Sequence, residues 1–516
     1  MASTRELLKR SVHRLTSVHR LQVRTSSTAG SVATDQVEAR PFEEIPGPRG
    51  MYRLPIIGSM LLFKPFSKYT AETYPQLLNE LFDRHGPIMK LNLASPMVVV
   101  SDPKDFETVF ANEGKYPYRP SDPITEQYLK RSTRKLPMTG VHGEEWHALR
   151  TPVNRRLMKA DSATHYLEPQ NQVADDFVKI LETRDLKNED QADLFYRFAS
   201  ESIGVVTFNQ RLGYLDNKSD VASIKFLEAA KSLFLQIAKG VTGRSVGHNW
   251  YRNSTLREYE RAVDIMIGNS KVHTKKAIEI TEQQRRDGTL NPEEPNLLLS
   301  LASEKALTDD DVSNTIIALY VAGTDSTAKN LQVFFYNLAK NPDKQETLRK
   351  EVLGLIGPSG PLTDKALSQM TYLKACLKES FRLNYPTLSG TTRVLPVDVV
   401  LSGYKVPSGT MINMFNPRPS KLNFDEPDKY LPERWLRSSE KRKQDPSNNM
   451  AVLPFGHGPR NCIGRRFAVQ EIYLATSKVL QKLKIELEPE SWNTQFQYSS
   501  FLIEPEKPLK FKFTRL

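Results

Sequence analysis

The stretch Phe455-Gly456-His457-Gly458-Pro459-Arg460-Asn461-Cys462-Ile463-Gly464 surrounds one cysteine with glycines and basic side chains. Glycine permits backbone bends that other residues resist, and we expect Gly458 and Gly464 to supply such bends here. A thiolate is stabilised by nearby N–H donors and positive charge. The stretch therefore predicts a loop that presents Cys462 as a thiolate ligand, with Arg460 placed to bind a carboxylate.

These residues resemble the haem-binding loop of the cytochrome P-450 family, F-x-x-G-x-R-x-C-x-G, at every fixed position: Phe455, Gly458, Arg460, Cys462 and Gly464. The resemblance implies haem b (iron protoporphyrin IX) with Cys462 as the axial ligand to iron, and Phe455, Arg460 and Gly464 as further cofactor-binding residues. It also implies that family's fold, a mainly α triangular prism with minor β. A buried structural cysteine is the other reading of such a loop.

Composition agrees with a globular, mostly helical protein. The 516 residues are 39% hydrophobic and 26% charged, and the mean hydropathy is −0.48. Cys376 and Cys462 are the two cysteines, which excludes a disulfide framework. The net charge is +12, and the sequence contains no nucleic-acid-binding motif. Because the charge is positive, acidic proteins or anionic lipid are the expected partners.

The amino terminus is basic, with Glu6 as its acidic residue before position 35. This composition and an amphipathic spacing of leucines predict a mitochondrial transit peptide in residues 1–40, followed by one catalytic domain in residues 41–516. A disordered basic tail is the alternative. The basic residues are Arg5, Lys9, Arg10, Arg14, Arg20 and Arg24.

Apolar periodicity predicts a large α domain with small β pieces. Residues 74–84 and most of 144–340 are expected to be helical. Residues 88–93 and 97–101 are expected to form paired strands, and residues 391–412 and 496–513 are strand-like.

One long helix is predicted from Thr308 to Asn341, because Thr308 and Asp311 form a capping-box pattern and Asn341 precedes a proline. Its middle, 322–327, reads Ala-Gly-Thr-Asp-Ser-Thr. Glycine and hydroxyl side chains weaken a helix, so we expect a local opening there that leaves room for dioxygen and water.

This run resembles the family's oxygen-activation motif, in which an acid is followed by an alcohol. The resemblance implies that Asp325 relays protons and that Ser326 donates a hydrogen bond at the oxygen site. Thr327 is a second candidate for the latter role. Threonine is usual at the Ser326 position, and serine lacks the methyl group that restricts the side-chain rotamer. The sequence therefore does not decide how efficiently electrons are coupled to product formation.

Glu379 and Arg382 are three residues apart on a predicted helix. With Arg434, they resemble the family's buried structural network beneath the haem loop. Trp146 and Arg150, four apart, resemble its W-x-x-x-R helix that reaches the haem propionates, and Arg393 fits a further propionate contact from a strand.

Lys374 and Lys378 are one helical turn apart and resemble the lysines with which mitochondrial members of the family bind an acidic [2Fe–2S] ferredoxin. Arg465 and Arg466 match the basic pair of the same subgroup, although Val469 stands where that subgroup often has Glu. The resemblance therefore implies electrons from NADPH through a ferredoxin reductase and ferredoxin.

The predicted function is that of a monooxygenase that hydroxylates a lipophilic sterol, steroid or secosteroid. The predicted location is the matrix side of the inner mitochondrial membrane, where apolar residues 226–237 would contact the lipid. Expected pocket segments, 118–141, 233–237 and 318–322 with Leu388 and Phe501, do not decide the substrate. Two alternatives remain: a haem-thiolate isomerase or dehydratase of lipid peroxides, and a haem sensor or electron carrier with six-coordinate iron.

Overall fold

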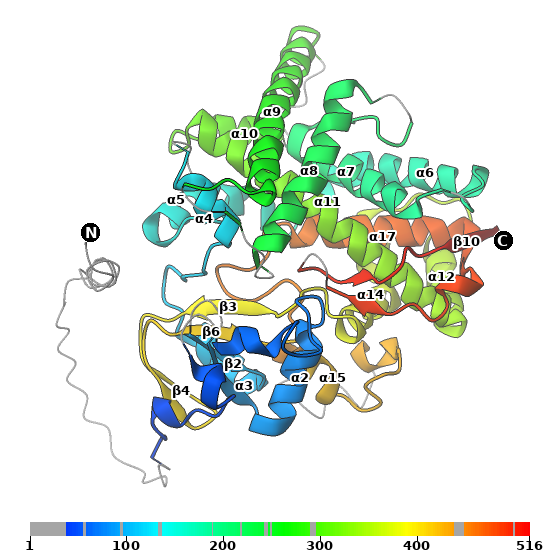
Figure 1. Cartoon of the computed structure of the whole chain (residues 1–516). Helices are drawn as coiled ribbons and strands as arrows, with labels where there is room; N and C mark the ends of the chain where they lie inside the picture. Colours follow the sequence, from blue (N-terminus) through cyan, green and yellow to red (C-terminus); the bar gives the residue numbers. More distant parts are fainter. Residues whose placement is uncertain are drawn as a thin grey trace, which may run out of the picture. The chain divides into compact units, whose positions relative to one another are not determined.

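The computed structural model describes residues 38–516 except 55–57, 93–95, 133–136, 188, 217–218, 242–245, 248–249, 289–295, 438–447 and 499–500 (Figure 1). Residues Arg40–Leu516 form one compact unit. The predicted transit peptide lies almost wholly outside the described residues.

Helices dominate the compact unit, as the periodicity predicted (Figure 1). The α-helices are α2 (Tyr74–His85), α3 (Pro103–Ala111), α4 (Pro123–Leu129), α5 (Gly143–Leu157), α6 (Leu167–Thr183), α7 (Gln191–Phe208), α8 (Val221–Val241), α9 (Ser254–Arg286), α10 (Leu297–Ala302), α11 (Asp309–Lys340), α12 (Pro342–Ile356), α13 (Asp364–Gln369), α14 (Thr371–Leu383), α15 (Pro419–Leu422), α16 (Asn448–Ala451) and α17 (Arg465–Lys482).

The strands are short and lie mostly with α2 and α3 (Figure 1). A four-stranded sheet has the order β1 (Ile88–Asn92), β2 (Pro96–Val100), β6 (Met411–Met414), β3 (Thr391–Val394), and only the β2–β6 pair is parallel. The expected pairing of 88–93 with 97–101 is confirmed. Three further pairs join β4 (Val399–Leu401) to β5 (Tyr404–Val406), β7 (Leu483–Leu487) to β10 (Phe511–Arg515), and β8 (Phe496–Gln497) to β9 (Glu504–Pro505).

Helix α11 forms the centre of the helical part and contacts α7, α8, α9, α12, α14 and α17 (Figure 1). Its predicted cap is confirmed: the N–H of Asp311 donates to the Thr308 hydroxyl at 3.3 Å, and the N–H of Thr308 donates to the Asp311 carboxylate at 2.9 Å. The expected opening at 322–327 is wrong, because α11 is α-helical throughout. The Ser326 hydroxyl bonds to the Ala322 carbonyl at 2.6 Å without interrupting the helix.

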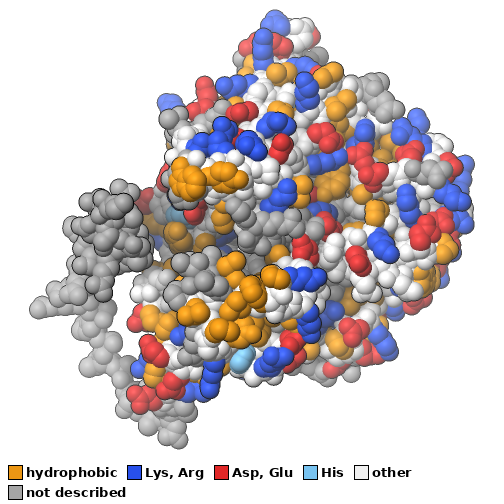
Figure 2. All heavy atoms as spheres, in the orientation of Figure 1, with side chains coloured by type: hydrophobic (Ala, Val, Ile, Leu, Met, Phe, Trp, Pro, Cys, Tyr) orange, Lys and Arg blue, Asp and Glu red, His pale blue; other side chains and the backbone are white. Residues whose placement is uncertain are grey.

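The apolar segment expected to form a surface patch at 226–237 is mostly buried. Phe226 is 0% exposed and Phe234 is 9% exposed, because α8 packs against α9 and α11 and uses these side chains as core. Within this segment Leu235 is exposed, at 45%, and most of the other large exposed apolar residues of the described chain lie elsewhere. On the face drawn in Figure 2, hydrophobic side chains gather over the N-terminal part of the described chain. The exposed apolar residues outside the segment include Met51, Leu54, Met60, Phe66 and Trp250. Among the described residues, we find no helix long and apolar enough to span a membrane.

Candidate functional site

The Cys462 loop is a sequence of tight turns that ends where α17 begins. The Cys462 N–H donates to the Phe455 carbonyl at 2.8 Å, and the Asn461 N–H donates to the Gly458 carbonyl at 3.1 Å. Gly458 has a φ of 73°, and a Cβ added there would lie 2.0 Å from a carboxylate oxygen of Glu113, so this position requires glycine. Gly464 lies in the turn before α17 with a φ of −86°, a backbone conformation that does not by itself require glycine.

The Cys462 thiol is accessible, and it stands at the N-terminal end of α17. Burial is the largest effect and raises the pKa of the thiol above its usual value, and the backbone N–H groups of Gly464 and Arg465 and the charges of Arg150 and Arg465 offset part of that rise. The local donors and cations favour the thiolate, the form that ligates metals.

Four arginines lie around the Cys462 loop and act on one another, and two of them, Arg119 and Arg150, also act on the thiol: the four are Arg119, Arg150, Arg393 and Arg460. Burial, reinforced by the other three guanidinium groups, lowers the pKa of Arg460 to about 9. Burial also lowers the pKa of Arg150 to about 10.

Two carboxylates partly offset this charge. Arg393 donates to Glu113 at 2.6 Å, and Asp122 raises the pKa of Arg119 against the effect of burial. Four guanidinium groups against two carboxylates leave positive charge for an anionic ligand. Arg119 was not predicted as a site residue, because its approach to Cys462 depends on how the segment before α4 folds back.

The predicted cofactor-binding residues come together around the loop. Trp146 and Arg150 lie on α5, and the Arg460 guanidinium stacks 4.1 Å above the Trp146 ring. Arg150 donates to the Asn461 carbonyl at 2.8 Å, and Arg460 donates to the carbonyls of Pro117 and Val141 at 3.0 and 2.8 Å. These bonds orient each guanidinium. Arg393 lies on β3, and Phe455 contacts Phe381 of α14 edge-on at 5.5 Å.

Glu379, Arg382 and Arg434 form one buried network next to this loop. Arg382 donates to Glu379 through two nitrogens, each at 2.9 Å, and Arg434 donates to the same carboxylate at 3.0 Å. The Trp435 indole N–H adds a bond of 2.8 Å. Glu379 and Arg382 are both 0% exposed. The structure thus joins the three residues that the sequence had grouped.

The three motif residues of α11 point in different directions. The Ser326 side chain is partly accessible, and Ala322, one turn before it, is exposed. Asp325 is 5% exposed and accepts the hydroxyl of Tyr196. Thr327 is 1% exposed and its hydroxyl lies toward Glu471 of α17. Ser326 therefore carries the more accessible hydroxyl of the two candidates, and the Thr327 hydroxyl faces the interior.

Glu471 is a second functional candidate that the sequence reading missed. It is 1% exposed, and Gln170 donates to it at 3.0 Å. Burial raises the pKa of this carboxyl to about 8, although Ser202, Thr327 and Gln170 lower it. It lies directly behind Thr327, so a protonatable group adjoins the α11 motif.

The predicted partner-binding cations lie on α14 and α17. Lys374 is exposed and donates to the Ser368 carbonyl at 2.5 Å, and the Lys378 ammonium lies 4.0 Å from the centre of the Trp435 ring. Arg465 is exposed and lies over Phe455 at 5.7 Å. Arg466 donates to the Met158 carbonyl at 3.2 Å.

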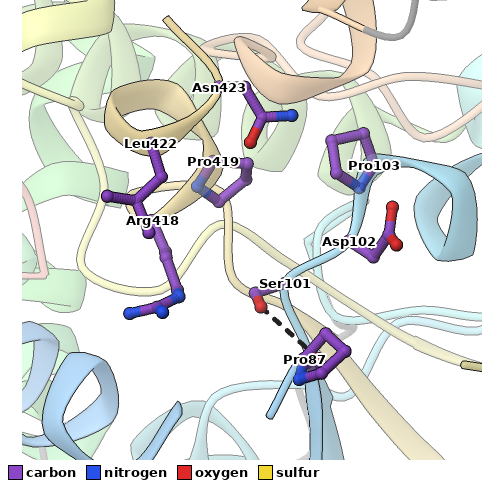
Figure 3. Close-up of a pocket in the computed structure, with 8 residues that line it drawn as sticks. All are labelled: Pro87, Ser101, Asp102, Pro103, Arg418, Pro419, Leu422 and Asn423. Atoms are coloured by element: carbon purple, nitrogen blue, oxygen red, sulfur yellow. Dashed lines mark hydrogen bonds between the residues drawn. The ribbon is translucent and has the colours of Figure 1, made fainter. Parts of the chain in front are cut away.

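A separate surface pocket of about 240 Å³ lies between the start of α3 and α15 (Figure 3). Its charged side chains already have partners: Asp102 caps α3 through the Lys104 N–H at 2.9 Å, and Arg418 pairs with Asp83 at 2.8 Å. It contains neither Cys462 nor any residue of α11, so it is not part of the site described above.

An accessible thiol at a helix N-terminus, faced by arginines with surplus positive charge, fits a metal cofactor that carries carboxylates. This is the donor set of a haem-thiolate protein. The chain belongs to the cytochrome P450 family, whose model matches residues 48–513.

Curated relatives are matched over nearly their whole length. "Probable cytochrome P450 12a5, mitochondrial" of Drosophila melanogaster is 32% identical over 93% of this chain and 92% of its own length. Cytochrome P450 CYP12A2 of Musca domestica is 31% identical over 96% and 94%, and "Probable cytochrome P450 12e1, mitochondrial" of D. melanogaster is 30% identical over 94% of both chains.

Family membership implies a thiolate-ligated haem and monooxygenase chemistry. The residues present fit this cofactor: Cys462 would ligate the iron, and Arg119, Arg150, Arg393 and Arg460 would bind its carboxylates. Bound haem supplies the redox chemistry of dioxygen activation, and the protein supplies orientation, charge and protons.

Proposed function

We propose that this P450 receives electrons from NADPH through a ferredoxin reductase and an acidic [2Fe–2S] ferredoxin, and hydroxylates a lipophilic sterol, steroid or secosteroid. The observation that carries the electron-donor proposal is the position of the cations near the thiolate loop. Lys378 and Phe381 share α14, Phe381 contacts Phe455, and Arg465 lies over Phe455. A cationic surface of this kind attracts an acidic partner to the side of the protein from which Cys462 is presented.

Each site residue has a proposed task. Cys462 ligates the iron, and the four arginines orient the haem by binding its carboxylates. Glu379, Arg382 and Arg434 stabilise the fold beneath the loop. Ser326 holds a proton at Oγ on the accessible face of α11, and Asp325 supplies protons to it. The apolar character expected of the substrate comes from the family resemblance, not from a contact in the described residues.

The proposed location is the matrix side of the inner mitochondrial membrane. It is supported by the mitochondrial relatives and by the basic, Ser-rich residues 1–40, which we propose act as a transit peptide. Peripheral lipid contact would use the exposed Met51, Leu54, Met60 and Phe66, in place of the buried residues of α8.

Reconstitution tests the proposal. Haem-loaded protein, purified mitochondrial ferredoxin, its reductase and NADPH are incubated with a sterol and steroid panel, and products are identified by mass. We expect a product that gains one oxygen atom, with a rate that falls as salt rises. Turnover of lipid hydroperoxides without NADPH would support the isomerase alternative, and iron with a second protein ligand would support the sensor alternative; either result would contradict the proposal.

A further inference from the structure

Glu113 is a buried carboxylate that lies between Arg393 and the Cys462 loop. It follows Ala111, the last residue of α3, by two residues, and its side chain is 3% exposed. Its Oε2 accepts the Nε–H of Arg393, on β3, at 2.6 Å, and the Arg393 side chain is 1% exposed. The two side chains therefore form a short, buried ion pair that involves one of the four arginines around the loop.

The second oxygen of Glu113 faces the loop itself. Among the described residues, no donor bonds to Oε1, which is buried. A Cβ added at Gly458 would lie 2.0 Å from this oxygen, so the carboxylate packs directly against the backbone of the loop. A buried acceptor without a protein donor is unfavourable, so Glu113 is held at this position by the cations around it.

Glu113 also supplies the charge that compensates Arg393. The Arg393 guanidinium lies 3.0 and 3.5 Å from the carbonyl oxygens of Thr392 and His457, and 5.6 Å from the centre of the Phe110 ring. Carbonyl dipoles and an aromatic face attract a cation but carry no net charge. Arg393 is therefore oriented by several groups, whereas its charge is offset chiefly by Glu113.

Burial and the neighbouring cations act on Glu113 in opposite directions. Burial is the largest effect and raises the pKa of the carboxyl, and Arg393, His457 and Arg460 offset part of that rise. The short bond to the guanidinium favours the charged pair, because hydrogen bonds between ionised partners are the stronger ones. A carboxylate that binds to Arg393 therefore meets another that is already there.

Binding of a cofactor that carries carboxylates would give the Arg393 cation a second anionic partner. Attraction to Arg393 is then opposed by repulsion from Glu113, and burial leaves this repulsion weakly screened. Negative charge beside the Cys462 loop also favours the oxidised, more positive form of a redox centre held there. Both effects come from the charge of Glu113 and not from its shape.

We propose that Glu113 is a positioning residue whose negative charge competes with the haem carboxylates for Arg393, which limits how tightly haem is held and lowers its reduction potential. The inference rests on the task proposed above for Arg393. The experiment therefore includes an Arg393 variant, so that a failure of that task can be told from a failure of the competition.

The first measurement follows the transfer of haem from the loaded protein to an excess of apomyoglobin. Glu113→Gln keeps the shape of the side chain and an acceptor for Arg393, and it removes the charge. We expect this variant to release haem about tenfold more slowly than the wild type, the size of effect that one unit charge has in a partly buried site.

Asp105→Asn is the matched control for the removal of a buried carboxylate. Asp105 lies on α3, is 6% exposed, and accepts the Ser402 N–H at 2.7 Å. Its partner belongs to the turn between β4 and β5 and not to the Cys462 loop. This variant should release haem at the wild-type rate.

The second measurement is a redox titration of the same loaded proteins. We expect a more positive midpoint potential in Glu113→Gln and an unchanged one in Asp105→Asn. A residue that only supported the fold would behave differently, because loss of its contacts would loosen the site and speed the release of haem. Slower release together with a more positive potential is therefore the signature of competition by charge.

Release of haem from Glu113→Gln as fast as from the wild type, or a potential that does not rise, would overturn the inference. If Glu113→Gln yields no haem-loaded protein, Glu113→Asp decides the result, because it withdraws the carboxylate from Arg393; faster release than in the wild type would then overturn the inference. Arg393→Gln should release haem faster than the wild type, and an unchanged rate in that variant would contradict the task proposed for Arg393.

Discussion

Replacing Glu379 with alanine is expected to lower the free energy of unfolding by about 3 to 5 kcal/mol, because it leaves buried charges unpaired. The carboxylate accepts bonds of 2.8 to 3.0 Å from Arg382, Arg434, Trp435 and the Leu431 N–H. Arg382 and Arg434, 0% and 6% exposed, would keep their charges without it. The loss corresponds to roughly a hundredfold to several-thousandfold shift toward the unfolded state.

The assay is urea unfolding, followed by circular dichroism, together with haem content per chain. Glu258→Ala is a matched control, because Glu258 and Arg261 on α9 have the same three-residue spacing at 3.2 Å but side chains that are 43% and 71% exposed. That variant should lose less than about 1 kcal/mol. We expect Glu379→Ala to be purified without haem. Normal haem content with stability equal to that of the control would refute the reasoning.

Three further predictions concern charge. Burial raises the pKa of Glu471 to about 8, so above the usual carboxyl pKa the folded state binds a proton that the unfolded state has lost. As the pH rises from the usual carboxyl pKa to 8, the free energy of unfolding should fall by about 1.4 kcal/mol per pH unit. Glu471→Gln should remove this slope in unfolding measured across pH, and equal slopes in the variant and the wild type would contradict the prediction. Arg119→Met should weaken haem binding by about 1.5 to 3 kcal/mol in a haem-transfer assay, and unchanged transfer would exclude Arg119 as a carboxylate partner. We expect a higher KM for ferredoxin, and a KM that depends less on salt, in Lys374→Glu and in Lys378→Glu. The control Lys275→Glu, on α9, should show neither change. An equal KM in all three variants would contradict the proposed docking surface.

Local patterns predicted a large part of the fold. The Thr308–Asp311 cap, the proline after Asn341 and the strand pair before α3 depend on neighbouring residues, so they could be read along the chain. The spacing of Trp146 and Arg150 also suffices to place them on one face of α5.

Features that depend on tertiary packing could not be predicted in the same way. Phe226, Leu233 and Phe234 of α8 are core because α9 and α11 cover them, whereas Leu235 stays exposed, and periodicity does not reveal which face is covered. Arg119 and Glu471 belong to the site through contacts with distant segments. For Asp325, Lys329 lies within one helical turn, but Tyr196 and Glu504 are separated from it by 129 and 179 positions, respectively.

The central claim is that the Cys462 sulfur ligates haem iron, and the absorption spectrum of the reduced protein under carbon monoxide tests it most directly. The wild type should show the red-shifted Soret band of a thiolate-ligated haem. Cys462→Ala should lack that band while remaining folded by circular dichroism. Retention of the same band by Cys462→Ala would contradict the claim.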